Sequence, residues 1–313
     1  MPRIVFFGTA ELACASLEAL LRSPAFQVIA VVSQPDKPRG RDLQLQPSPV
    51  KATALCHNIP VLQPKRARSD EFIQQVRDLA PDLSVVVAYG QILPQPLLDV
   101  PKLGSLNVHT SILPKHRGAA PIQSAILSGD PVTGVTIMKM DAGLDTGPIL
   151  SVRTTPIADT DNSQTLHDRL ADLGAELLVE TIPNFIAGSI TPQPQPEGAT
   201  YARKIEKSDG LINWQEPAAE IWRKLRAFTP WPGAFTYYEV AGKKRMLKIL
   251  EAVPSDASGQ PGRMLSSSRD GIVIAASTGS LRATAVQPEG RKRMTVQEFL
   301  AGNSLPVGQE FTR

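Results

Sequence analysis

The chain is poor in cysteine, in aromatic residues and in long apolar runs. Its 313 residues include two cysteines, and Phe, Trp and Tyr together make up 5%. Two thiols can build neither a disulfide framework nor a four-ligand zinc site. The longest uncharged apolar stretch, 83–98, is interrupted by a glycine and two prolines, so we expect no membrane-spanning segment. The composition favours a globular protein of the cytoplasm, without a cleaved leader or a membrane partner.

Motifs for several common chemistries are also missing. The four histidines and two cysteines are not clustered at ligand spacing, so no catalytic metal is expected. The chain has no Gly-x-Ser-x-Gly segment, which argues against a serine hydrolase. The first strand-to-helix turn, 7–10, has one glycine where a dinucleotide fingerprint needs three, which argues against a nicotinamide dehydrogenase.

Charge is unevenly distributed along the chain. The net charge is +3, but residues 207–313 carry 15 Lys and Arg against 10 Asp and Glu, whereas residues 1–206 carry 18 against 20. A basic C-terminal third beside a nearly neutral body favours an anionic partner for that third. Ordinary solvated surface charge is the competing explanation.

Apolar runs alternate with helical periodicity in the first 186 residues. Near-continuous runs at 4–7, 28–32 and 83–88 have the pattern of strands buried on both faces. Further strands are expected at 106–108, 134–140 and 149–154, and helices at 13–21, 72–79, 119–127 and 166–186. This alternation predicts an α/β domain with a doubly wound, mostly parallel sheet.

The pattern changes after residue 189. Alternating prolines in 191–196 favour a stiff, extended conformation. A helix is expected at 218–228, followed by short β-like runs at 234–238, 246–250, 271–276 and 281–286, a spacing typical of a small antiparallel barrel. We therefore predict an N-terminal domain, 1–189, a linker, 190–206, and a C-terminal barrel domain, 207–313.

Two polar side chains lie at the end of the run at 106–108. Asn107 and His109 are two residues apart on an extended segment, so their side chains point to the same side. Parallel α/β sheets bind ligands beyond the carboxyl ends of their strands. An amide donor beside an imidazole can stabilise an oxyanion and move a proton. A structural role for a lone histidine is the alternative.

Two carboxylates follow the next apolar run. Asp141 and Asp145 lie in 141–147, where either could orient the His109 ring and favour its imidazolium form. Turn capping is a strong alternative for Asp141 and a weaker one for Asp145.

The proline-rich loop 34–49 is longer than most βα connections. It carries Lys37, Arg39 and Arg41, whose side chains suit phosphate contacts. A solvated loop without function is the alternative.

These residues lie in blocks that resemble the folate-dependent formyltransferases. The blocks are NVHTSILP at 107–114, RGAAPI at 117–122, TGVT at 133–136 and MDAGLDTG at 140–147. Shorter blocks match at 7–9, 34–36, 47–51 and 87–94, and TPWPG at 229–233 and QPEGRKRM at 287–294 resemble the second domain of a member that acts on tRNA. The resemblance covers essentially the whole chain.

The resemblance implies a Rossmann-like formyltransferase domain and an OB-like barrel. It implies 10-formyltetrahydrofolate as the formyl donor and initiator methionyl-tRNA as the acceptor, with no metal and no obligatory protein partner. Asn107, His109 and Asp145 match the family's catalytic trio. The candidate folate contacts are Tyr89, Gly90, Ser111, Ile112, Leu113 and Pro114, and the candidate tRNA contacts are Lys37, Arg39, Arg41, Lys204, Lys207, Arg291, Lys292 and Arg293.

The trio suits direct transfer of an acyl group to an amine. In this hypothesis the α-amino group of methionine attacks the formyl carbon. Asn107 and protonated His109 hold the developing oxyanion, and Asp145 fixes His109 and helps to relay the proton.

Four other functions stay open from the sequence. A sugar-nucleotide formyltransferase shares the two-part layout, and a glycinamide ribonucleotide formyltransferase shares the trio but ordinarily lacks the barrel. A formyltetrahydrofolate hydrolase would use water as the acceptor. A non-catalytic RNA-binding protein would not need the trio.

Overall fold

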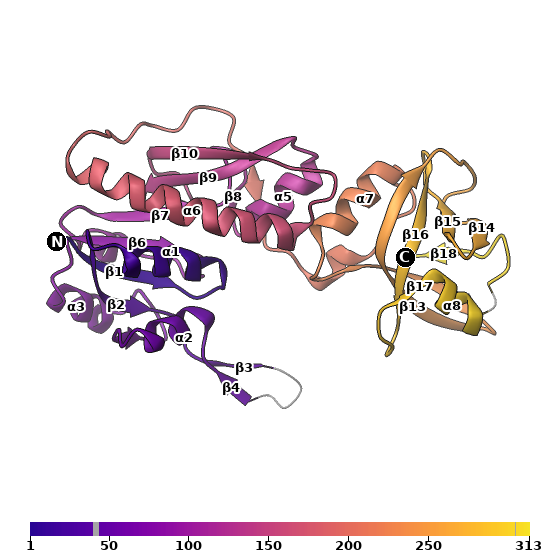
Figure 1. Ribbon diagram of the computed structural model, residues 1–313, viewed down its shortest axis with the longest axis horizontal. Coiled ribbons are helices and arrows are strands. Elements are labelled where there is room, and N and C mark those ends of the chain that lie inside the picture. Colours follow the sequence, from indigo (N-terminus) through magenta and orange to yellow (C-terminus); the bar gives the residue numbers. More distant parts are fainter. Residues whose placement is uncertain (40–43, 304) are drawn as a thin grey trace. The chain divides into compact units, whose positions relative to one another are not determined.

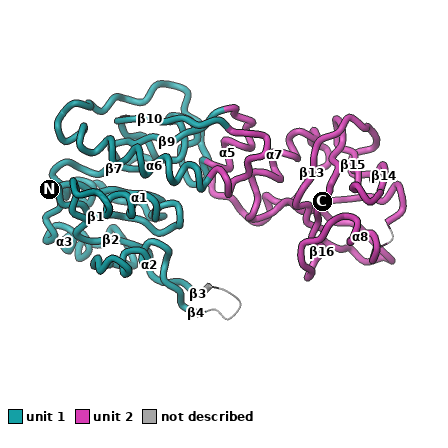
Figure 2. Tube along the Cα trace, viewed as in Figure 1, with its two compact units in different colours: residues 1–121, 132–156, 167–202 teal, residues 122–131, 157–166, 203–313 magenta. Residues whose placement is uncertain are grey.

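The computed structural model describes residues 1–39, 44–303 and 305–313. These residues form two compact units, which Figure 2 distinguishes by colour. Unit 1 comprises residues 1–121, 132–156 and 167–202, and unit 2 comprises residues 122–131, 157–166 and 203–313. Residues 190–202, from the segment predicted as a linker, therefore belong to unit 1.

Unit 1 is built on a seven-stranded sheet of order β10-β9-β7-β6-β1-β2-β5 (Figure 1). The parallel strands are β1 (Arg3–Gly8), β2 (Gln27–Val32), β5 (Val61–Leu62), β6 (Leu83–Val87) and β7 (Ser105–His109). At one edge, β9 (Val132–Lys139) pairs antiparallel with β7, and β10 (Ile149–Pro156) pairs antiparallel with β9. The strand order reverses between β1 and β6, and open α/β sheets bind ligands at such a switch point.

Helices cover both faces of this sheet, because alternate side chains of a strand point to opposite faces. On one face, Val5 and Phe7 join a buried cluster with residues of α3 (Asp70–Asp78) and α4 (Gln95–Leu98). On the other face lie α1 (Leu12–Arg22) and α6 (Ser163–Ile186), the latter so close that a Cβ on Gly174 would lie 2.9 Å from Val108 of β7. The predicted doubly wound, mostly parallel sheet is thus confirmed.

Some short elements were not predicted by periodicity. α2 (Pro49–Cys56) begins at a capped turn, where Ser48 Oγ accepts a hydrogen bond from the Lys51 amide at 3.1 Å. Ser before Pro is a helix-start signal that the sequence does carry. β3 (Lys37–Arg39) and β4 (Gln44–Gln46) form a small antiparallel pair. β8 (Arg117–Gly118) and β11 (Tyr201–Ala202) form a parallel pair within unit 1.

Unit 2 contains an antiparallel sheet of order β14-β15-β16-β13-β12-β18. Its strands are β12 (Ala234–Val240), β13 (Lys243–Ser255), β14 (Met264–Ser268), β15 (Gly271–Ala275), β16 (Ser280–Pro288) and β18 (Phe311–Thr312), with β17 (Met294–Thr295) beside β16. The helices of this part of the chain are α5 (Pro121–Ser128), which enters unit 2 at Ile122, η1 (Lys207–Gly210), α7 (Ala218–Ala227) and α8 (Val296–Gly302).

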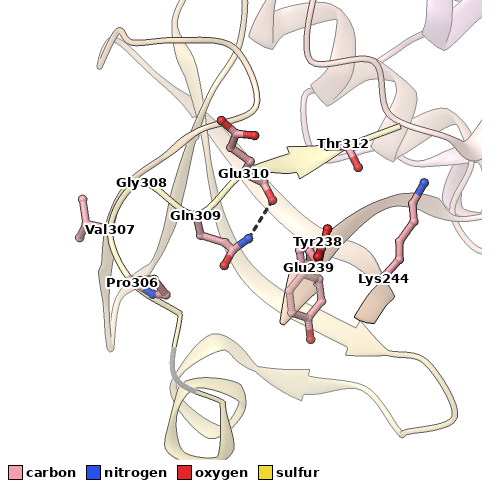
Figure 3. A pocket seen from close by; sticks show the side chains of 9 residues that line it. All are labelled: Tyr238, Glu239, Lys244, Pro306, Val307, Gly308, Gln309, Glu310 and Thr312. Carbon is pink, nitrogen blue, oxygen red and sulfur yellow. Dashed lines mark hydrogen bonds between the residues drawn. The ribbon is translucent and has the colours of Figure 1, made fainter. Parts of the chain in front are cut away.

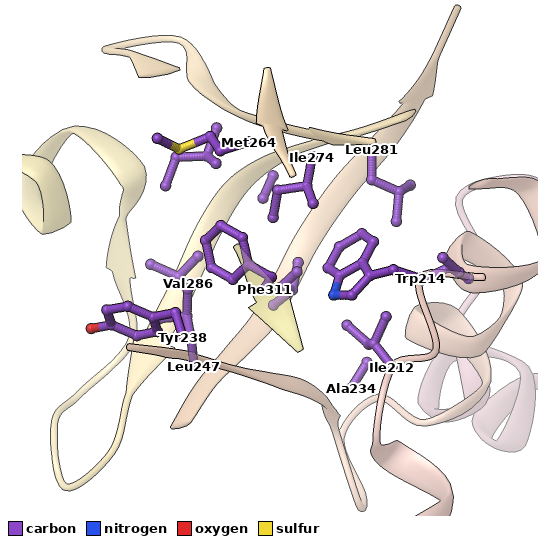
Figure 4. Close-up of a cluster of buried hydrophobic side chains, with 14 of the residues drawn as sticks. Ile212, Trp214, Ala234, Tyr238, Leu247, Met264, Ile274, Leu281, Val286 and Phe311 are labelled. Carbon is purple, nitrogen blue, oxygen red and sulfur yellow. The ribbon is translucent and has the colours of Figure 1, made fainter. Parts of the chain in front are cut away.

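Backbone hydrogen bonds join the two ends of the unit 2 sheet. The Met264 amide donates to the Gln309 carbonyl at 2.9 Å, and the Phe311 amide donates to the Gly262 carbonyl at 2.7 Å. These bonds curl the sheet toward closure, which agrees with the predicted OB-like barrel. Figure 4 shows the buried cluster inside it, where Trp214 lies beside Phe311. The indole Nε1 of Trp214 donates to Thr236 Oγ1 at 3.0 Å, so its only polar group is satisfied.

Candidate active site

β7 places Asn107 and His109 on the same side of the sheet, as their spacing predicts. Asn107 is paired with Val86 of β6 and Met138 of β9, and His109 with Thr136 of β9. Both side chains are largely buried, with 9% and 5% of the residue exposed. An interior strand between two neighbours holds its side chains rigidly, which is what a catalytic pair needs.

Asp145 meets both residues from the loop between β9 and β10. Its Oδ1 accepts from Asn107 Nδ2 at 3.4 Å, and its Oδ2 lies 3.7 Å from His109 Nδ1. Oδ2 also accepts a hydrogen bond of 2.8 Å from the backbone N–H of Gly118. The three residues that the sequence singled out therefore lie together in unit 1.

Asp141 has the capping role that was its alternative reading. Its Oδ1 accepts from the Gly143 amide at 3.0 Å and from Thr146 Oγ1 at 2.6 Å. These bonds shape the loop that carries Asp145, whose own φ of +52° is in the left-handed region. A non-glycine residue there is strained and needs the surrounding structure to hold it.

The hydrogen bonds of His109 define its proton positions. His109 Nε2 lies 3.0 Å from the carbonyl oxygen of His116, which can only accept, so Nε2 carries a proton. Burial is the largest influence and lowers the pKa of His109, while the nearby charge of Asp145 opposes it. The free protein therefore favours a neutral ring whose unprotonated Nδ1 faces Asp145, rather than the imidazolium that the sequence-based mechanism starts from.

The segment Ser111–Pro114 follows β7 after one residue, and the side chain of Thr136 fixes its backbone. The Thr136 hydroxyl donates to the Ser111 carbonyl at 2.7 Å and accepts from the Leu113 amide at 3.1 Å. Ser111 Oγ in turn donates to the Lys115 carbonyl at 2.6 Å. Ile112 and Pro114 lie on the same fixed loop, so the four candidate folate contacts adjoin the trio in sequence and in space.

Tyr89 and Gly90 follow β6 at the same edge of the sheet. The Tyr89 carbonyl accepts from Thr9 Oγ1 and from Gln34 Nε2, both at 2.9 Å. The ring of Tyr89, however, packs edge-on against Phe7 inside the unit 1 core, and burial raises its pKa to about 12. Any contact of Tyr89 with a folate would therefore come from its backbone.

The candidate tRNA contacts are spread over both units. Lys37 donates to Gln34 Oε1 at 2.8 Å, whereas Arg41 and the side chain of Arg39 lie outside the part of the structure that is described. Four of the candidate contacts in unit 2 are exposed, namely Lys204, Lys207, Arg291 and Lys292. Arg293 is also exposed but forms an ion pair with Glu251.

One cavity of unit 2 has no excess of basic side chains among its lining residues. It measures about 590 Å³ and is lined by residues of β12, β13 and the segment before β18 (Figure 3). Its charged lining residues are Glu239, Glu310 and Lys244. Glu310 forms an ion pair with Arg263, and Lys244 contacts the Arg313 carbonyl and the Tyr237 ring. We assign this cavity no part in the chemistry.

Sequence reasoning missed the groups that hold the trio and the adjacent segment Ser111–Pro114 in place. The His116 carbonyl, the Gly118 amide and the Gln195 side chain contact members of the trio, and the Thr136 side chain contacts Ser111 and Leu113. Backbone atoms carry no residue-type signal, and Gln195 is 50 residues from Asp145 in sequence.

The described part of the chain offers neither a metal-binding cluster nor a membrane-spanning helix. No group of three or more His, Cys, Asp or Glu residues in that part of the chain could hold a metal ion. None of the helices described there combines the length and apolar character needed to cross a membrane.

Two family models match the chain. One described as formyl transferase matches residues 2–182, and one described as formyl transferase, C-terminal domain, matches residues 204–304. The chain therefore belongs to the formyl transferase family, as the sequence blocks predicted.

Within this family the chain is similar to the methionyl-tRNA formyltransferases. Those of Citrifermentans bemidjiense and Myxococcus xanthus are each 48% identical to it, over 98% and 99% of this chain and 95% and 97% of their own lengths. The same fold occurs in an N-formyltransferase from Helicobacter canadensis in complex with folinic acid and dTDP-3-aminofucose (TM-score 0.64, 20% identity, 92% of this chain and 100% of that one). It also occurs in HypX from Aquifex aeolicus in complex with tetrahydrofolic acid (TM-score 0.63, 17% identity, 100% of this chain and 51% of that one).

Proposed function

We propose that this chain transfers the formyl group of 10-formyltetrahydrofolate to the α-amino group of methionine on initiator tRNA. The observation that carries the proposal is the similarity to methionyl-tRNA formyltransferases along both domains. The Asn107, His109 and Asp145 cluster supplies the chemistry that such a transfer needs. A role on initiator tRNA also implies the cytoplasm as the place of action.

The proton path begins from the neutral ring of His109. The acceptor amine attacks the formyl carbon, and its nitrogen becomes positively charged and acidic. Nδ1 of His109 accepts the released proton, and the resulting imidazolium is stabilised by Asp145 Oδ2 on the same side of the ring. His109 then returns the proton to the departing folate nitrogen, which leaves tetrahydrofolate and a formylated amine.

Asn107 is the candidate oxyanion donor. One N–H of its amide points to Asp145 Oδ1 at the long distance of 3.4 Å, so the group is positioned without being tightly engaged. Donors aimed at a developing oxyanion typically contribute about 10²–10³ in rate when they are fixed in advance. The position of Asn107 on an interior strand fixes its backbone in this way.

The formyl donor fits against the two loops that follow β6 and β7. The backbone at Tyr89 and Gly90 and the segment Ser111–Pro114 both follow the carboxyl ends of these neighbouring strands. Thr9 and Gln34 tie the first of these loops to the switch point, and Thr136 ties the second to β9. Such loops bind ligands in open α/β sheets.

The basic residues provide candidate contacts to the tRNA backbone. In unit 2, a cavity of about 620 Å³ is lined by Arg245 and Arg291, by Glu289 and Glu298, and by the apolar side chains of Met246 and Met294. The carboxylate of Glu298 is engaged by the backbone and hydroxyl of Thr295. Guanidinium groups beside an apolar wall suit a phosphate and its neighbouring nucleoside. Lys204, Lys207 and Lys292 are exposed in the same unit, and Lys37, Arg39 and Arg41 extend the proposal to the loop 34–49.

The test is transfer of a labelled formyl group to three acceptors offered in parallel. Methionyl initiator tRNA, glycinamide ribonucleotide and an amino-sugar nucleotide would each be incubated with 10-formyltetrahydrofolate and the protein. We expect product on methionyl-tRNA alone. Product on a small acceptor instead would overturn the proposed substrate, formate release without product would indicate a hydrolase, and no consumption of the donor would contradict an enzymatic role.

A further inference from the structure

The proline-rich segment 190–196 is attached to unit 1 by its backbone. Gln193 and Ile149, the first residue of β10, exchange two backbone hydrogen bonds of 2.8 and 2.7 Å. Pro192, Pro194 and Pro196 lack a backbone N–H and restrict their own φ, so this segment stays extended. The segment thereby runs beside the loop that carries Asp145.

Both the nitrogen and the oxygen of the Gln195 side-chain amide form hydrogen bonds to other segments of unit 1. Its Nε2 donates to the carbonyl oxygens of Asp145 and Gly147, both at 2.8 Å. Its Oε1 accepts from Arg117 Nε and Nη2 at 3.1 and 2.6 Å. Carbonyls can only accept and a guanidinium can only donate, so the network admits one orientation of this amide.

The two segments that Gln195 joins are the ones that position the Asp145 carboxylate. Asp145 is strained at a φ of +52° and is held through its own carbonyl by Gln195. Its carboxylate is held by the Gly118 amide, next in sequence to Arg117. The main chain of Asp145 is therefore held by Gln195 and its carboxylate by the Gly118 amide. Gln195 contacts both segments, because it also accepts from Arg117.

We propose that Gln195 is a positioning residue that aligns Asp145 with His109 for formyl transfer. Gln195 acts through the backbone of 145–147 and touches neither the reacting atoms nor His109. The kinetic test of this inference rests on the proposed function. The NMR titration of His109 rests on the structure alone. It gives the segment 191–196 a role in the active site of unit 1 as well as in joining the two predicted domains.

The test compares Gln195→Ala with Gln193→Ala. Gln193 lies in the same proline-rich segment, but its side chain is exposed and donates to the carbonyl of Thr191, two residues away, at 3.2 Å. Small displacements of a catalytic group reduce rates steeply, so we expect kcat of Gln195→Ala to fall about 10- to 100-fold with the KM for the donor within about two-fold. Gln193→Ala should match the wild type in both constants.

A second readout separates positioning from general stability. Asp145 raises the pKa of His109 against the effect of burial, and His116 is the other titratable residue beside the ring. Moving the carboxylate away removes this stabilisation, so NMR titration of His109 should give a lower pKa in Gln195→Ala than in Gln193→Ala. Loss of stability alone would leave the His109 pKa of the folded protein unchanged.

Gln195→Glu identifies which contact matters. A carboxylate keeps the pairing with Arg117 but cannot donate to the carbonyls of Asp145 and Gly147. We expect it to be as impaired as Gln195→Ala, and full activity of Gln195→Glu would overturn the proposal. If Gln195→Ala does not fold, Arg117→Met takes its place in the test. This variant removes the guanidinium that donates to Oε1 of Gln195, and we expect kcat and the His109 pKa to fall here too.

Failure of this inference is distinguishable from failure of the proposed function. A wild-type protein that transfers no formyl group to methionyl-tRNA refutes the function, and the His109 titration still tests the alignment. A wild type that is active beside a Gln195→Ala variant with unchanged kcat and unchanged His109 pKa refutes the inference alone.

Discussion

Replacing Asp145 by asparagine removes one negative charge while keeping the shape of the side chain. Asp145 Oδ2 lies 3.7 Å from His109 Nδ1, and the ring is buried. At an effective dielectric constant of about 20, a unit charge near this distance stabilises an imidazolium by about 4 kcal/mol. If the imidazolium forms only during proton transfer, this stabilisation is lost from the barrier, which corresponds to about 10³ in rate.

The introduced amide adds a second obstacle. In the neutral ring of His109, Nε2 carries the proton and donates to the His116 carbonyl, so Nδ1 holds a lone pair. The amide of Asp145→Asn can donate an N–H to that lone pair and hold the ring neutral. The NH2 group would then take the place of Oδ2, so the bond from the Gly118 amide is lost, while the Asp145 carbonyl still accepts from Gln195 Nε2 and helps to hold the loop.

The assay is a single-turnover transfer of a labelled formyl group, with Asp141→Asn as the matched control. Asp141 accepts from the Gly143 amide and from Thr146 Oγ1, and an amide oxygen can accept both bonds. We expect Asp141→Asn to stay within about two-fold of the wild type and Asp145→Asn to lose about 10³ with donor affinity retained. A loss below about ten-fold, or equal losses in the two variants, would refute the electrostatic argument.

Three further outcomes follow from the same geometry. Asn107→Ala should slow single-turnover transfer by about 10²–10³ with an unchanged melting temperature, and a rate within a few-fold of wild type would exclude it as the oxyanion donor. His109→Ala and Asp145→Ala should be non-additive because they act as one unit, so multiplicative losses in the double variant would argue against a relay. Replacing Arg291 and Lys292 by alanine should weaken tRNA binding and reduce the slope of log affinity against log salt by about 2, and an unchanged slope would remove both from the interface.

The fold was predictable where burial leaves a clear pattern of apolar residues in the sequence. β1, β2 and β6 are buried along nearly their whole length, so their sequences are apolar runs that cannot be confused with surface helices. α2 and α8 escaped this reasoning because each is short and has few buried positions. Their starts are marked by Ser48 and Thr295, whose side chains cap the first turn, so cap signals would have found them.

The proximity of Asn107, His109 and Asp145 was predictable for a different reason. Asn107 and His109 are separated by one residue on a strand, and a period of two fixes their common side without knowledge of the fold. Asp145 required a choice between two carboxylates, and the structure gives Asp141 the turn-capping bonds that were its alternative. The charge of His109 was not predictable, because it depends on burial that the sequence does not display.

The attachment of 190–202 to unit 1 shows where sequence reasoning stops. Alternating prolines correctly indicate an extended segment, but an extended segment can be a free connection or can lie along a neighbouring strand. The deciding contacts are the Gln193 backbone on Ile149 and the Gln195 amide on Asp145. Both join residues more than 40 positions apart, and no local pattern encodes such pairs.

In the proposed mechanism, the resting protonation state of His109 determines which form of the acceptor amine can react. A neutral His109 with a lowered pKa is too weak a base to deprotonate an ordinary α-ammonium group, whose pKa is about 7.7–8.0. The acceptor amine must therefore be neutral before it attacks. An ester carbonyl next to the amine withdraws electrons and weakens its basicity, so an aminoacyl ester meets this condition better than a free amino acid does.

In the proposed mechanism the proton moves only after the amine has attacked. The nitrogen of the tetrahedral adduct is then far more acidic than the free amine, and Nδ1 of His109 can accept its proton. The negative charge of Asp145, 3.7 Å from that nitrogen, gains most of its stabilising effect at this step because the ring is charged only there. An interaction that strengthens between the ground state and the transition state accelerates the reaction. Burial keeps the His109 ring neutral at rest, so Asp145 stabilises the ring mainly during proton transfer.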